Sequence, residues 1–258
     1  MPPFIPCQTI AEVIQRLDQI LERSIREQSK HGYFAALYRN VTVRVREWIR
    51  EGRFENGPRM ETLDVIFANR YLEALAQNLQ GQDTSRSWAV AFQAQSKWPP
   101  VIMQHLLLGM SAHINFDLAI AAVETAPGPL LPGLEYDFIL INRLLDEMID
   151  TVQEQINRVS PWFGLVDRLG GRTDEKICAF VIGAARELAW KEALHLATLE
   201  PAAYQREIER HDQQVAGLGQ AISSPGFPLR HGLLMVRMRE NFPIPVVIET
   251  LCMQRTPG

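Results

Sequence analysis

Apolar residues recur every three or four positions along most of the chain, the spacing that defines one face of an α-helix. Between these stretches stand turn residues such as Gly52, Gly81 and the pair Gly170-Gly171. The pattern predicts helices at about 10–29, 33–50, 60–79, 85–96, 99–125, 135–159, 173–199, 201–222 and 229–240, with a short helix from Trp162. No stretch alternates with the period of a strand, so we expect an all-α protein, with residues 1–258 forming one multi-helix domain. The apolar segment 243–253 is expected to form either a strand-like arm or a short packed helix.

Residues 98–124, WPPVIMQHLLLGMSAHINFDLAIAAVE, are apolar on almost every side. A helix that is hydrophobic all round is buried, so the rest of the domain is expected to wrap around a central helix at about 99–125. The segment nevertheless carries His105, Ser111, His113, Asn115 and Asp117. Because buried ionisable groups are costly unless they are paired, hydrogen-bonded or bound to a metal, these residues predict a polar cluster inside the fold.

His113 and Asp117 are four residues apart, which places them on one helical face. His105 is rotated from His113 by about 80°, whereas Asn115 is rotated by roughly 200° and is expected to face another neighbour. Imidazole and carboxylate groups suit a divalent metal such as zinc, manganese or iron, with His105 and His31 as further candidate ligands. Two alternatives need no metal: Asp117 orients His113, or each residue bonds to backbone or water.

Three more polar residues interrupt apolar runs and are candidates for catalysis: Asp64, Arg70 and Arg186. Asp64 has an alternative role as a hydrogen-bonding residue between helices. Arg186 has an alternative place on the solvated side of its helix. His211 lies in a polar segment and is expected at the surface.

Composition is that of a soluble globular protein, with 258 residues, 47% hydrophobic content and a net charge of −4. Nothing in this charge or in the motifs favours nucleic acid. The three cysteines form no CxxC motif and the N-terminus lacks the pattern of a secretory signal, so we expect a cytoplasmic protein. Residues 101–123 are long enough to span a bilayer, but their histidines and aspartate favour a soluble core helix.

Five runs resemble a bacterial family of helix-rich proteins of unknown function, centred on an HINxDL motif. They are FAALYRNVT (34–42), DVIFANRYLEA (64–74), QHLLLGMSAHINFDLAIA (104–121), FILINRLLDEM (138–148) and AARELAWKEA (184–193). The resemblance covers roughly residues 25–200, leaves 201–258 as a C-terminal extension, and implies one all-helical domain. Ser111 stands where the motif leads us to expect asparagine.

The order His31, Asp64, His105, His113, Asp117 is also faintly similar to zinc-dependent phospholipases C and single-strand nucleases. Those enzymes have a later His-x-x-x-Glu/Asp pair. Here Leu199 stands four residues after His195, so a trinuclear zinc site is not expected.

Three functional hypotheses follow. The first is a metal-dependent hydrolase acting on a phosphate ester, in which the metal activates water and Arg70 or Arg186 neutralises substrate charge. The second is a non-catalytic protein that binds a small lipophilic ligand in an apolar cavity beside the central helix. The third is a polar cluster that only fixes the register of the helices.

Overall fold

The computed structural model describes residues 4–97, 100–160, 174–227 and 229–252, with the backbone alone for residues 174–181. Every regular element within these ranges is helical, which confirms the all-α prediction. The short helix predicted from Trp162 and the helix start predicted at Thr173 lie outside the described residues.

Helices begin and end within a few residues of the predicted positions, because capping residues and turn residues mark them in the sequence. Thr9 caps the first helix by accepting a hydrogen bond from the Glu12 backbone, and Asn56 and Ser85 act in the same way. The elements are α1 (Ile10–Glu27), α2 (His31–Arg50), α3 (Gly57–Leu79), α4 (Arg86–Gln95), α5 (Ile102–Met110), η1 (Ser111–Asp117), α6 (Leu118–Thr125), η2 (Gly128–Leu134), α7 (Glu135–Val159), α9 (Asp174–Leu196), α10 (Pro201–Ser223), α11 (Leu229–Arg239) and α12 (Ile244–Cys252).

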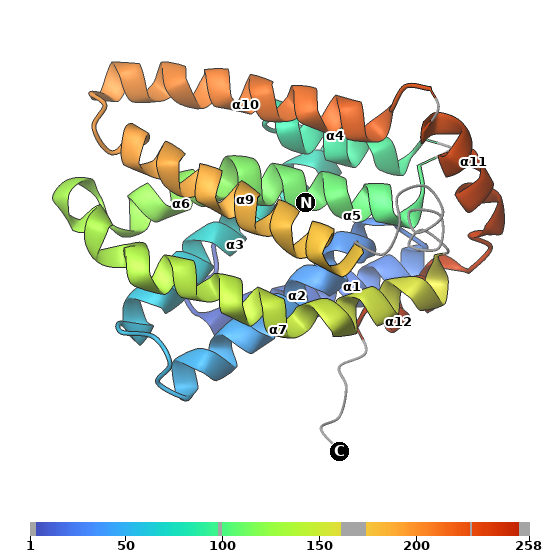
Figure 1. Ribbon diagram of the computed structural model, residues 1–258, viewed down its shortest axis with the longest axis horizontal. Coiled ribbons are helices and arrows are strands. Elements are labelled where there is room, and N and C mark those ends of the chain that lie inside the picture. The colour runs from blue at the N-terminus through green and yellow to red at the C-terminus, as the bar shows by residue number, and fades with distance from the viewer. Residues whose placement is uncertain (1–3, 98–99, 161–173, 228, 253–258) are drawn as a thin grey trace.

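The segments α5, η1 and α6 form one continuous central helix, Ile102–Thr125. It contacts α2, α3, α4, α9 and α10, and Figure 1 shows it passing behind α9, between α10 and α7. Among the described residues it is the one helix long and apolar enough to cross a membrane, but 72% of its most apolar stretch is buried inside the protein. The prediction of a buried central helix is therefore confirmed.

Two buried acidic side chains hold helix N-termini in place. Asp212 of α10 accepts hydrogen bonds from the backbone N–H groups of Arg86 and Ser87 at the start of α4, at 2.7 and 2.9 Å. Glu240 accepts from the Ile102 backbone at 3.0 Å and from the Ser160 hydroxyl at 2.6 Å. Because the first N–H groups of a helix have no partner within it, a carboxylate at that position is stabilising. Asp212 thereby ties α10 to α4, and Glu240 ties the C-terminal part of the chain to the central helix.

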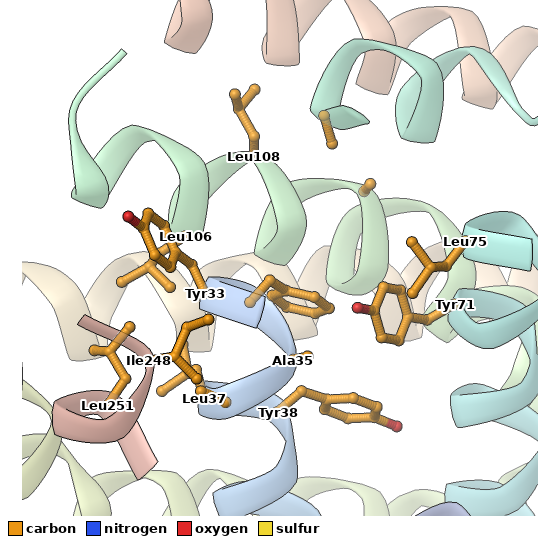
Figure 2. Packing of buried hydrophobic residues seen from close by; sticks show 14 of the residues in the cluster. Tyr33, Ala35, Leu37, Tyr38, Tyr71, Leu75, Leu106, Leu108, Ile248 and Leu251 are labelled. Carbon is orange, nitrogen blue, oxygen red and sulfur yellow. The ribbon is translucent and has the colours of Figure 1, made fainter. Parts of the chain in front are cut away.

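The apolar tail forms a short helix, α12, that packs against α1, α2 and α7. Figure 2 shows Ile248 and Leu251 of this helix beside Leu37 of α2. The Asn40 side chain donates a hydrogen bond of 2.7 Å to the Leu251 carbonyl oxygen. Of the two expected forms of the tail, the packed helix is the one observed.

Candidate functional site

The central helix changes from α to π geometry at Ser111–Asp117, the part that carries its polar residues. The Leu118 N–H donates to the His113 carbonyl oxygen, which is an i to i+5 bond. Short π segments within α-helices are often found at functional sites. The wider turn also changes which residues share a face: Asn115 and His113 line the same cavity, although α-helical spacing placed them on different sides.

Asp117 is fully buried and accepts hydrogen bonds from side chains of different helices. The Arg70 Nε donates to one carboxylate oxygen at 3.0 Å, and the Trp88 Nε1 donates to the other at 2.8 Å. The His113 Nδ1 lies 3.4 Å from that second oxygen. These donors compensate the cost of burying the carboxylate, so Asp117 joins α3, α4 and the central helix.

His113 lies within an aromatic enclosure. Its ring stacks on Phe67 with centroids 3.5 Å apart and meets Tyr38 edge to face at 4.5 Å. Burial lowers the pKa of His113, against the opposing effect of Asp117, so the ring is neutral at pH 7. Because Asp117 is the acceptor, the proton lies on Nδ1 and the Nε2 lone pair is free, and Nε2 has no hydrogen-bond partner among the described residues.

A cavity of about 560 Å³ runs along one side of the central helix. Its wall is formed by residues of α2, α3, α5, η1, α6, α7, α9 and α10. Most of the lining is aliphatic or aromatic, including Leu107, Met110, Ile114, Leu145, Met148 and Ile149. The volume falls within the range of small-molecule sites, and the wall has the apolar character typical of them.

Tyr38, Asp64 and His113 line this cavity, and each has a buried polar atom without a partner among the described residues: Tyr38 Oη, Asp64 Oδ2 and His113 Nε2. Burial raises the pKa of Asp64 from its ordinary value of 3.8 to about 8, so the carboxyl group is mainly protonated at pH 7. Burial also raises the pKa of Tyr38. All three side chains are therefore mainly uncharged at pH 7, and their unpaired polar atoms are buried within the wall.

Arg186 of α9 also lines the cavity and is only 5% exposed. Its place on a solvated helix face, one of the two alternatives drawn from the sequence, is therefore wrong. The partners that hold it are neutral: the Asn142 side-chain oxygen and the Phe138 carbonyl oxygen, each at 2.7 Å. The sequence alternates apolar and polar residues too irregularly here for periodicity to show which side of α9 is buried.

His105 and His31 lie apart from the pair formed by His113 and Asp117. His105 packs edge to face on Tyr33, and His31 packs in the same way on Phe92. Across the described ranges, no three His, Cys, Asp or Glu side chains gather closely enough to hold a metal ion. The structure thus brings His113, Asp117 and Arg70 together, places Asp64 in the wall of the cavity that His113 also lines, and gives both other histidines different neighbours.

Sequence reasoning missed two neighbours of the polar cluster. Trp88, in an unremarkable amphipathic stretch, donates to Asp117. His211 was expected at the surface but is half-buried, with its Nε2 lying 2.6 Å from the Asn115 carbonyl oxygen. No local pattern in the sequence signals this contact, because the two residues are 96 positions apart.

Comparison with known proteins adds a family but no activity. A model of a family of unknown function, DUF5995, matches residues 10–225. No curated protein and no solved structure matches the chain. The matched part contains the central helix, Asp117 and all the described residues that line the cavity. Since the match covers most of its length, the chain belongs to the DUF5995 family, whose function is unknown.

Proposed function

We propose that the protein binds a small, predominantly apolar molecule in the cavity beside the central helix. The observation that carries this proposal is a cavity of about 560 Å³ whose wall is mostly aliphatic and aromatic. An apolar ligand would match this wall, and a polar end would pair with one of its few polar residues, such as Ser111, Asn115 or Arg186.

Energetics favours an occupant. An apolar molecule in the cavity would gain dispersion contacts with the aliphatic and aromatic side chains of the wall. Burial of its own apolar surface would add to that gain.

The metal-dependent hydrolase receives weaker support. His113 and Asp117 are adjacent, as that hypothesis requires, but Arg70 and Trp88 already donate to the two oxygens of Asp117. Elemental mass spectrometry on protein purified without tag or chelator tests this hypothesis. Stoichiometric zinc, manganese or iron that is lost in a His113→Ala/Asp117→Ala variant would support it.

Binding is tested by titrating the purified protein with Nile red, an uncharged dye that fluoresces in apolar surroundings. We expect saturable binding to the wild type and loss of binding in Ile149→Trp, because the indole fills part of the cavity. The matched control is Ile139→Trp on the same helix, since Ile139 is 52% exposed and does not line the cavity. Failure of the wild type to bind the dye, or equal binding by Ile149→Trp, would contradict the proposal.

A further inference from the structure

The acidic and the basic side chain of the cavity wall differ in their charge state at pH 7. Arg186 is the single Lys or Arg among the described residues that line the cavity, and Asp64 is the single acidic residue. Asp64 is mainly uncharged at pH 7, as its raised pKa of about 8 indicates. Burial lowers the pKa of Arg186 to about 9, which still leaves the guanidinium group mostly protonated. The described part of the wall therefore carries one net positive charge.

That positive charge has no counter-ion in the described part of the chain. No described carboxylate lies within ion-pair distance of Arg186, in contrast to Arg70, which pairs with Asp117 at 3.0 Å. Burying a cation without an anion is costly, and neutral acceptors compensate only part of that cost. A bound anion would supply the missing charge.

The guanidinium group is held in a fixed orientation with donors to spare. Nε bonds to Asn142 and Nη2 to Phe138, while the group lies 4.6 Å from the centre of the Phe138 ring. These contacts use two of the five N–H donors of arginine. Because its partners already fix the side chain, an incoming anion would meet a preorganised donor set.

We propose that the ligand is a lipophilic monocarboxylic acid, whose carboxylate pairs with Arg186 while its hydrocarbon part occupies the cavity. This inference rests on the proposed function. A single charge is favoured over a phosphate dianion because one arginine would leave the second negative charge buried and unpaired. Apolar residues of α9 and α7 that line the same cavity, such as Ala185, Leu145 and Ile149, provide the surface for the hydrocarbon chain.

The test compares dodecanoic acid, dodecan-1-ol and dodecyl phosphate by competition against Nile red at pH 7. These molecules share one chain length and differ in the charge of the head group. We expect the acid to bind the wild type about tenfold more tightly than the alcohol or the phosphate, the effect of one charge-assisted pair. Arg186→Gln should weaken acid binding about tenfold and leave alcohol binding nearly unchanged. The matched control is Arg143→Gln, since Arg143 is exposed on α7 and should not affect either ligand.

Equal binding of acid and alcohol by the wild type would overturn the assignment of a carboxylate, as would tighter binding of the phosphate. If Arg186→Gln does not fold, the wild-type comparison of head groups still decides, and Arg186→Lys provides a variant that keeps the charge. Binding of the alcohol without preference for the acid would refute only this inference. If the wild type binds neither ligand nor the dye, the proposed function itself fails.

Discussion

Asp117 accepts hydrogen bonds from Arg70 and Trp88, which come from two other helices, and lies beside His113 of its own. Such a set of contacts fits the hypothesis that the polar cluster fixes helix register, and it accounts for Asp117 without a ligand. It does not account for His113 Nε2, Tyr38 Oη or Asp64 Oδ2, which have no hydrogen-bond partner among the described residues. Some residues of the cluster therefore support the fold, and others are candidates for contact with a ligand.

Asp64 predicts a particular dependence of stability on pH. Its pKa is about 8 in the folded protein against an ordinary value of 3.8, so between these values the unfolded chain releases a proton that the folded chain retains. The contribution of Asp64 to stability must then fall as pH rises from about 4 to 8, by at most about 1.4 kcal/mol for each pH unit.

Asn at position 64 cannot ionise, so we expect Asp64→Asn to become progressively more stable than the wild type as pH increases over that range. Urea unfolding of both proteins at pH 5, 6, 7 and 8 measures the difference. The other titrating groups cancel in this difference, among them His31 and His105, whose pKa values burial lowers to about 4 and about 3. A difference that stays constant with pH would show that Asp64 is ionised in the folded protein.

At the scale of elements, the central helix depends on close approach to α2. A Cβ atom added at Gly109 would lie 2.5 Å from Cγ of Phe34, far inside van der Waals contact. Phe34 in turn packs edge to face on His113 and Tyr71, so its position affects the aromatic enclosure of the site. The small residue at position 109 allows the two helices to approach one another directly before the π segment begins.

Gly109→Ala should therefore lower the free energy of unfolding by about 1–3 kcal/mol, the usual cost of overpacking a core. The control is Gly217→Ala in α10, where an added Cβ meets nothing within 4 Å and alanine should stabilise the helix by up to about 1 kcal/mol. Denaturant unfolding of the two variants measures both effects. Equal changes in the two proteins would mean that helix propensity alone, and not the contact with Phe34, decides the outcome at position 109.

For the whole molecule, the first two helices pack against the last one. The C-terminal helix α12 lies beyond the part matched by the family model, yet it packs on α1 and α2 near the N-terminus. Ile248 is fully buried, and its side chain occupies the space beside Gly32. The first helices and the last one thus share one hydrophobic core.

Ile248→Ala is expected to destabilise the protein by about 2–4 kcal/mol, because it removes buried methylene and methyl groups and leaves a cavity. Val246→Ala on the same helix should have little effect, since Val246 is 39% exposed. Thermal unfolding followed by circular dichroism compares the two variants. A melting temperature of Ile248→Ala equal to that of Val246→Ala would show that α12 does not contribute to the stability of the fold.

Helix positions and the pair His113–Asp117 could be predicted because both depend on residues a few positions apart. The predicted helix at 135–159 matches α7, Glu135–Val159, because turn residues before it and Ser160-Pro161 after it mark both of its ends in the sequence. Burial of the central helix was predictable for a similar reason, as a segment that is apolar on all sides has no face suited to water.

The sequence by itself thus determined the helices, their approximate ends and which of them lies at the centre, because helical periodicity and capping act over a single turn. Only the tertiary structure decided that Trp88 reaches Asp117, that Arg186 is buried with no acidic partner in the described part of the chain, and that the helices surround a cavity of about 560 Å³. These properties depend on how side chains distant in sequence fill shared space. That filling is set by the packing of the whole core and not by any local pattern.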